Sequence, residues 1–198
     1  MTAEKAIVIP PINLQKMAVP IVGITPLLTN RFSEASIASI EDKQQKKAKL
    51  VKDARNPEAE FHAAAHLIAK GVYGFPAGGI RKALVAAGGR FAAEKMTHLR
   101  GALNILGDLI EIKAPAPIMR SDTIRLQGTK SSMAYRPQFD PWTMEVPVVF
   151  NASIIGQEQV LNLFQIAGFA VGIGAWRPEC NGTFGQFQLA GDGAEAAP

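Results

Sequence analysis

The sequence has a single cysteine, Cys180, among its 198 residues, so the chain cannot form an internal disulfide. A lone thiol fits a reducing compartment. The chain does not open with a charged segment followed by an apolar one, which predicts no secretory signal. No uninterrupted apolar run is long enough to span a bilayer. These absences predict a cytoplasmic protein without a membrane partner.

Patterns of known catalytic and metal sites are also scarce. His62 and His66 are four residues apart, but Ala63 stands where a zinc protease carries glutamate, and no cysteine cluster supplies further ligands. The chain has neither a GxxxxGK[ST] phosphate loop nor a dinucleotide fingerprint. We therefore expect no cofactor, no metal and no catalytic residue. Asp108 and Asp122 keep a metal-dependent nuclease as the enzymatic alternative.

The composition predicts a folded α+β domain. Apolar residues make up 47% of the chain and charged residues 19%, which is enough to build a core. The 18 glycines and 13 prolines imply many turns and argue against a helix bundle. We expect one domain over 1–190, with insertions at 30–56 and 114–142, and a disordered small-residue tail at 191–198.

The clearest elements lie at the end of the chain, where a strand, a helix, a glycine-rich turn and a closing strand follow one another. The earlier elements are a strand that ends at Thr25–Pro26, a helix that begins at Pro57, a second helix that can resume after Gly88–Gly89, and a strand interrupted by Gly107–Asp108. The expected ranges are strands at 19–24, 105–112, 144–151 and 184–189, and helices at 57–69, 80–87 and 157–171.

Charge is unevenly distributed along the chain. Residues 1–139 carry 20 of the 21 Lys and Arg residues, whereas residues 140–198 carry only Arg177 against six acidic residues. A basic part attracts phosphates, and basic and acidic parts on one chain favour head-to-tail association of copies. Ordinary solvated surface is the alternative interpretation.

Three segments combine features that suit nucleic acid. At 74–84 a glycine-rich bend leads into a helix whose first turn carries Arg81 and Lys82, where free N–H groups and the helix dipole favour an anion. The alternative is a tight loop before an amphipathic helix with solvated charges. At 172–185 the turn offers Trp176 for stacking and Arg177 as a charge, and the alternative is a structural turn with the tryptophan in the core.

The third segment, 115–142, is an extended excursion. Cations that contact a backbone and aromatics that stack on bases are typical of sequence-tolerant single-strand binding. The alternative is a β-hairpin that packs its aromatics on the core. The residues concerned are Arg120, Arg125, Lys130 and Arg136, spread among Ile124, Tyr135, Phe139 and Trp142.

At these places the chain resembles the RAMP superfamily, which includes the backbone subunits of the CRISPR effector complexes of antiviral defence. The similar stretches are 23–27 (GITPL), 75–84 (FPAGGIRKAL), 172–174 (GIG) and 182–185 (GTFG). The resemblance implies a modified ferredoxin-like (RRM-type) fold, with an antiparallel sheet, helices on one face and a basic hairpin or thumb. The chain departs from the family in its short length and in Lys82–Ala83, where members more often have Gly and Ala before an Arg.

The resulting hypothesis is a non-catalytic protein that binds single-stranded RNA, with single-stranded DNA as the alternative ligand. The resemblance implies a head-to-tail homo-oligomer along the strand, with other CRISPR-type subunits as further partners. A structural or assembly protein, such as a viral accessory subunit, is the rival hypothesis. The expected nucleic-acid contacts are Arg31, Arg81, Lys82, Arg120, Arg125, Lys130, Arg136, Trp176 and Arg177.

Overall fold

The computed structural model describes residues 11–32, 37–38, 41–42, 44–45, 54–125 and 131–191. Three predicted features lie wholly or partly outside these ranges: Lys130, much of the insertion expected at 30–56, and the tail from residue 192. The described chain is a mixed α+β fold whose strand pairs are all antiparallel, as expected. None of its helices is both long and apolar enough to cross a membrane.

A four-stranded sheet forms the centre of the molecule. Its strands lie in the order β10 (Phe187–Leu189), β1 (Leu14–Gly23), β9 (Thr143–Asn151) and β5 (Leu103–Ile105). Alternate residues of β1 and β9 face the core, because Val19 pairs with Val146 in the antiparallel register and both side chains are fully buried. The opposite face is mostly exposed on β1 and mostly half-buried on β9.

Two prolines lie inside the central strands without breaking the sheet. The carbonyl oxygen of Pro20 accepts from Ala190 N at 3.0 Å, and that of Pro147 accepts from Leu106 N at 2.9 Å. In an antiparallel ladder the N–H and C=O of one residue point to the same side. The position of the missing N–H therefore faces the end of β10 at Pro20 and the end of β5 at Pro147. The long β1–β9 ladder therefore loses no hydrogen bond.

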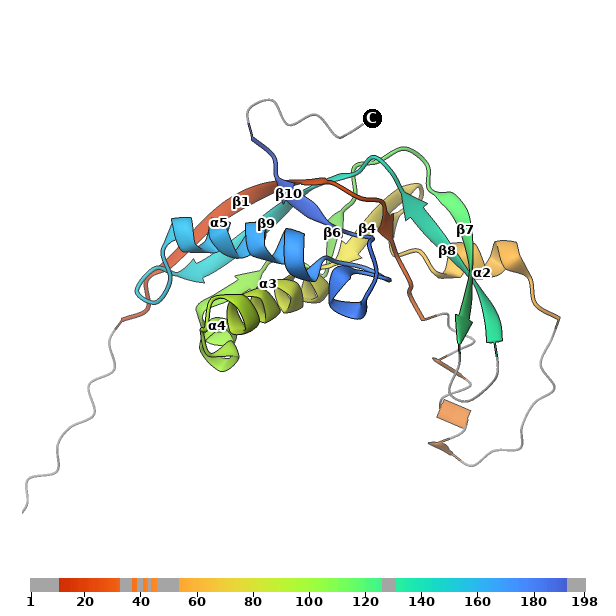
Figure 1. The fold of residues 1–198 in the computed structure, drawn as a ribbon, viewed down its shortest axis with the longest axis horizontal. Helices are drawn as coiled ribbons and strands as arrows, with labels where there is room; N and C mark the ends of the chain where they lie inside the picture. The colour runs from red at the N-terminus through yellow and green to blue at the C-terminus, as the bar shows by residue number, and fades with distance from the viewer. Residues whose placement is uncertain are drawn as a thin grey trace, which may run out of the picture.

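Helices cover one face of this sheet (Figure 1). Helix α3 (Ala77–Phe91) and helix α5 (Gln157–Ile166) pack on it side by side, α5 continues into a π-helical turn (Ala167–Val171), and α4 (Met96–Ala102) packs beside α3. Fully buried aliphatic and aromatic side chains fill the space between the layers. They include Val19, Val146 and Val148 from the sheet, Ile80 and Leu84 from α3, and Val160 and Phe164 from α5.

Helix α3 is longer than predicted and runs through Gly88–Gly89 without a break. The reason is packing, because a Cβ at Gly88 would lie 2.2 Å from Leu99 Cδ1 and 3.1 Å from Leu163 Cδ2. The absent side chain lets α4 and α5 approach α3 closely. The glycine pair thus serves helix packing, which outweighs its low helix propensity.

Two three-stranded sheets flank the central one. In the first, β2 (Leu27–Leu28), β8 (Ser131–Phe139) and β7 (Ile118–Arg125) are neighbours in that order, and β7–β8 is a long hairpin with α2 (Pro57–Ala63) packed against β8. The hairpin and α2 form the right-hand end of the molecule in Figure 1. In the second, the order is β3 (Leu67–Ala69), β4 (Val72–Pro76) and β6 (Leu109–Glu111).

Other predicted elements also differ in extent: the strand expected over 19–24 is β1 (Leu14–Gly23), and the strand expected over 184–189 is limited to β10 (Phe187–Leu189). The helix expected over 57–69 ends at Ala63, because the Ala64 carbonyl accepts from Thr29 Oγ1 and Arg31 N, and Gly71, with φ +77°, turns the chain from β3 into β4. The strand expected over 105–112 is split between two sheets. Its first part pairs with β9 and its second part with β4, so the Gly107–Asp108 turn does not form a hairpin.

Candidate nucleic-acid interface

The glycine-rich turn is built from closely crossing backbones. Ile173 N donates to Gly185 O at 2.9 Å, Gly185 N to Pro26 O at 2.8 Å and Ala175 N to Leu28 O at 2.8 Å. Gly185 has φ +68°, and a Cβ there would lie 1.8 Å from the Ile173 carbonyl oxygen. The segments 23–27, 172–174 and 182–185 therefore meet in space, and the glycines are required by backbone contact alone.

A cleft of about 330 Å³ opens between this turn and the start of α3. The Asn30 segment and His66 complete its wall, so the cleft joins the segments 74–84 and 172–185 that were singled out in the sequence. The lining residues are Thr29, Asn30, His66, Phe75, Pro76, Gly79, Lys82, Ala83, Gly172, Ile173, Gly174, Ala175, Arg177 and Glu179.

Lys82 is the exposed cation of this cleft. Within the described part of the chain, it has neither a hydrogen bond nor an ion pair. The side chain of Arg31 is likewise exposed and without such a partner among the described residues. Both side chains are therefore accessible to a ligand anion, and their role as nucleic-acid contacts stays a prediction.

His66 adds a titratable group to the cleft. Burial lowers the pKa of His66 below its ordinary value, and the charge of Arg31 lowers it further. The surroundings therefore favour the neutral imidazole, and an anion in the cleft would favour the imidazolium form. Sequence reasoning assigned His66 no role, since only its spacing to His62 drew attention.

Arg177 is used inside the turn. Its Nε donates to Glu179 Oε2 at 2.9 Å and its Nη1 to Gly174 O at 3.2 Å, while Arg90 Nη2 lies 2.9 Å from Glu179 Oε1. Burial raises the pKa of Glu179, but the Arg177 hydrogen bond and the charges of Arg177, Arg90 and Lys82 outweigh it, so the pKa lies below its ordinary value. Arg177 therefore shapes the cleft wall. The neighbouring Trp176 remains 44% exposed.

Arg81 points away from the cleft. Its Nε donates to the Leu103 carbonyl oxygen at 3.2 Å and its Nη2 to the Arg100 carbonyl oxygen. These bonds join α3 to α4 and to the start of β5. Consecutive residues of a helix project about 100° apart, which is why Lys82 lines the cleft and Arg81 does not.

The hairpin aromatics Phe139 and Trp142 are buried, so their interpretation as base-stacking groups is wrong. Phe139 packs edge-on against Tyr73 with ring centroids 5.3 Å apart, and Trp142 packs against Phe187 at 6.5 Å. The alternative interpretation, a hairpin that packs aromatics on the core, holds for these two rings. Tyr135 is half-buried beneath the guanidinium of Arg55, 5.7 Å from its ring centroid.

The hairpin cations have different surroundings. Arg120 and Arg136 are cross-strand partners in the β7–β8 register. Arg120 Nε donates to both Asp122 oxygens at 2.9 and 3.1 Å, and its guanidinium lies over the Phe184 ring at 4.8 Å. Arg136 is buried. The Arg125 side chain and Lys130 are outside the described part of the structure.

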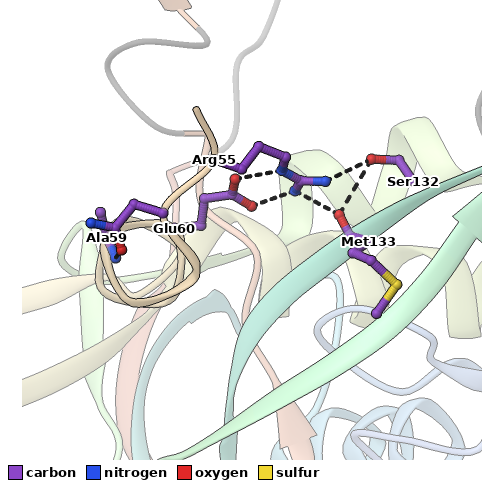
Figure 2. A network of polar contacts seen from close by, with 6 residues as sticks. Arg55, Ala59, Glu60, Ser132 and Met133 are labelled. Atoms are coloured by element: carbon purple, nitrogen blue, oxygen red, sulfur yellow. Dashed lines mark hydrogen bonds and ion pairs between the residues drawn. The ribbon is translucent and has the colours of Figure 1, made fainter. Parts of the chain in front are cut away.

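A polar clamp holds the hairpin to the segment before α2 (Figure 2). Arg55 donates to both oxygens of Glu60, with Nε–Oε1 at 2.7 Å, to Ser132 Oγ at 3.0 Å and to the Met133 carbonyl oxygen at 2.7 Å. The Asn56 side chain caps α2 by accepting from Ala59 N at 3.1 Å. The Asn-Pro pair at 56–57 signalled the helix start, but nothing local signalled the clamp.

The remaining polar candidates do not gather into a site. His62 lies on α2 within 3.5 Å of Glu58, whereas His66 lies beyond the helix in the cleft. Across the described residues, no three His, Cys, Asp or Glu side chains come together as metal ligands would. Cys180 is free and exposed.

Compared with known proteins, the chain matches no protein-family model and no curated sequence at a significant level. A functional assignment therefore has to come from the fold and from the cleft.

Proposed function

We propose that this protein is a non-catalytic binder of single-stranded nucleic acid, with RNA as the first ligand to test. The observation that carries the proposal is the cleft between the start of α3 and the glycine-rich turn. It combines Lys82, an exposed cation that makes no hydrogen bond or ion pair with the described residues, with a second cation, Arg31, and an exposed stacking surface, Trp176, nearby. Cations for phosphates and an aromatic for a base are the requirements of single-strand binding.

The topology supports a ferredoxin-like fold of the RAMP type. The central sheet and its two covering helices come in the chain order β1, α3, β5, β9, α5 and β10, which is β-α-β-β-α-β once the intervening elements are set aside. In the sheet these four strands lie in the order fourth, first, third, second, and both helices pack on one face. The β7–β8 hairpin then takes the place of a thumb-like insertion between the second and third of these strands.

A bound strand would follow a path from the cleft onto the hairpin. The Thr29 amide donates to the Pro137 carbonyl at 3.2 Å, so the cleft wall at Thr29 lies beside β8. The partly exposed Arg120 lies on β7 along this path, and the buried Arg136 lies opposite it on β8. Successive phosphates would meet Lys82 and Arg31 first and the hairpin next, which agrees with a protein that reads backbone and shape.

The direct test is binding of a labelled single-stranded RNA, followed by fluorescence anisotropy at ~50 mM salt and then at rising salt, conditions under which phosphate contacts are first strong and then screened. Lys82→Gln and Arg31→Gln should each weaken binding and reduce the salt slope by about one. Lys95→Gln is the matched control, because Lys95 is exposed at the start of α4 and lies outside the cleft lining. Failure of the wild type to bind RNA or DNA single strands at low salt would overturn the proposal.

Polymerisation along the strand is a separate part of the proposal. It rests on the uneven charge along the chain, with a basic part that can meet the acidic part of a neighbouring copy. Nuclease digestion of the complex should leave protected strands whose lengths differ by a fixed step. A continuous smear of lengths would contradict ordered assembly.

An exposed apolar pair favours assembly of protein on protein as a second candidate function. Phe169 is 75% exposed and Ile24 is 48% exposed. Gln186 brings their segments together, since its Nε2 donates to Phe169 O at 2.9 Å and its carbonyl accepts from Ile24 N at 2.9 Å. Multimers that form without nucleic acid and are lost in Phe169→Ser would support this candidate.

A further inference from the structure

Arg136 is a buried cation whose hydrogen-bonding groups are not satisfied. Its side chain is only 8% exposed, and its Nε and Nη1 atoms are buried without a hydrogen-bond partner in the structure. Burial lowers the pKa of the Arg136 guanidinium, and the charge of Asp122 only partly opposes this. An unpaired buried charge is costly, so such a group usually marks a missing partner.

The one acidic neighbour of Arg136 in the described structure is already engaged. Asp122 Oδ2 lies 3.9 Å from Arg136 Nη1, beyond hydrogen-bonding distance, while both Asp122 oxygens accept from Arg120 Nε. The cluster therefore holds two guanidinium groups against one carboxylate. Its net charge of +1 would be neutralised by one further negative charge.

Arg120 is the member of the cluster that a ligand can reach. Its side chain is 37% exposed, and its guanidinium carbon lies 4.8 Å from the centroid of the Phe184 ring. Its Nη1 makes only a long contact of 3.4 Å with Gln138 Oε1. A guanidinium with its Nε freed offers two parallel N–H groups, which is the geometry that grips a phosphate with two hydrogen bonds.

We propose that Arg120 binds one phosphate group and that Asp122 then turns from Arg120 to Arg136. In the free protein Asp122 occupies Arg120 and leaves Arg136 unmet. In the bound protein the phosphate replaces Asp122 at Arg120, and the carboxylate crosses the short remaining gap to satisfy Arg136. The bound state is favoured because the N–H groups of Arg136 then gain an acceptor. Arg136 touches no ligand and acts through Asp122, so it is a positioning residue.

The site deepens the proposed function, since its phosphate would be one of a bound strand, and in that respect the inference rests on that function. A free phosphate ion carries the same chemistry from another source. The two sources are separated by titrating the protein with inorganic phosphate and, in a second arm, with a single-stranded RNA. Both arms use the full chain with ¹⁵N-labelled arginine side chains observed by NMR.

In the titration with RNA, the Arg120 Nε–H resonance should shift. It should also shift in the titration with inorganic phosphate if the free ion binds at Arg120. The Arg136 Nε–H resonance should gain protection from exchange in the same titration. Arg136→Met, which removes the buried charge at similar volume, should weaken binding at Arg120 about tenfold, the equivalent of ~1.4 kcal/mol, the size of one hydrogen bond to a charged group. Arg100→Gln removes an exposed arginine on α4 and should change neither result.

The outcomes distinguish this inference from the proposed function. If RNA binds and Lys82→Gln weakens it, but the Arg120 resonance does not move, the phosphate site is wrong and the cleft stands. If phosphate shifts Arg120 while no RNA binds, the site stands and the strand-binding function fails. An Arg136→Met protein that folds and binds as the wild type would overturn the exchange, and the wild-type resonances decide the question if that variant does not fold.

Discussion

The indole Nε1 of Trp142 donates a hydrogen bond of 2.9 Å to the carbonyl oxygen of Thr25, 117 positions earlier in the chain. The same tryptophan accepts from Gly23 N through its own carbonyl at 2.9 Å. A Cβ at Gly23 would lie 2.2 Å from Trp142 Nε1, so the indole fits against a bare backbone. Trp142 thus joins the end of β1 to the start of β9 and fixes the segment on which the glycine-rich turn rests.

Trp142→Phe should therefore destabilise the fold. The substitution leaves the Thr25 carbonyl without its donor and opens a cavity in the core, which together should cost about 2 kcal/mol or more. Trp176→Phe is the control, because Trp176 is 44% exposed and its substitution should change the free energy of unfolding by less than about 0.5 kcal/mol. Urea denaturation of both variants measures the difference, and equal midpoints would contradict the role given to Trp142.

The glycines of the turn should not tolerate a side chain. Gly185→Ala places a Cβ against the Ile173 carbonyl and forces a left-handed backbone on alanine, which alone costs about 1–2 kcal/mol. Gly101→Ala, within α4, meets nothing within 4 Å and should stabilise the fold by about 0.4–1 kcal/mol. Thermal unfolding should rank the proteins as Gly101→Ala, wild type, Gly185→Ala. The reverse order would show that the crossing backbones can move apart.

The Arg55 clamp should control the order of the hairpin more than the stability of the whole protein. Arg55→Gln removes the bonds to Ser132 and Met133, yet the groups are exposed and such pairs contribute about 0–1 kcal/mol. Hydrogen exchange of the β8 amides should become faster, while that of β1 and β9 stays unchanged. Glu58→Gln, whose partner is His62 on the same helix, leaves the hairpin untouched and is the control. Unchanged β8 exchange in Arg55→Gln would dismiss the clamp.

Strand binding should become stronger as the pH falls towards and below about 6.5, the ordinary pKa of histidine. The folded pKa of His66 lies below the ordinary value of about 6.5, and a phosphate in the cleft favours the imidazolium, so binding takes up a proton in this range. Stability has the opposite sign, because the unfolded chain takes up the proton first as the pH falls below that ordinary value. His66→Gln should remove much of the pH dependence of binding. An identical pH profile in that variant would exclude His66 as its source.

Glu179 should contribute to stability only above acidic pH. Its folded pKa lies below the ordinary value of about 4.3, so its contribution is fully present above that value and is lost as the pH falls through the folded pKa. The free energy of unfolding of the wild type should therefore fall below pH ~4.3 more steeply than that of Glu179→Gln. Glu60, whose pKa the Arg55 hydrogen bond lowers, remains in both proteins as a shared background. Parallel profiles would contradict the role of Glu179.

Local sequence patterns predicted where helices and strands form better than they predicted which other segments those elements contact. The closing unit of strand, helix, turn and strand follows from apolar spacing at 144–171 and from the glycines after it, and β9 and α5 lie where expected. The predicted end of the helix at Gly88–Gly89 was wrong, because these glycines allow close packing by Leu99, which belongs to a helix later in the chain. Helix α2 ends early because the Ala64 carbonyl is taken by Thr29 and Arg31, which no local signal announces.

The site shows the same division. The sequence singled out Lys82, Arg31 and the glycine-rich turn, and these line or border one cleft. It could not foresee that Arg81, one residue before Lys82, bonds to carbonyls of α4 and β5. Residue type indicates which groups can carry charge to a ligand, but the tertiary partner decides which of them is still available.

Pro147 has an effect on a part of the chain some forty positions away from it. Its carbonyl receives the Leu106 amide, but it has no amide of its own to return, so the ladder between β5 and β9 loses its reciprocal bond at that point. Beyond Leu106 the chain leaves the central sheet, passes the Gly107–Asp108 turn and pairs with β4 as β6. The missing N–H of Pro147 thus coincides with the end of β5 and with the passage of the chain into another sheet. Pro147→Val would supply the absent N–H donor, and the pairing between β5 and β9 could then extend beyond Leu106.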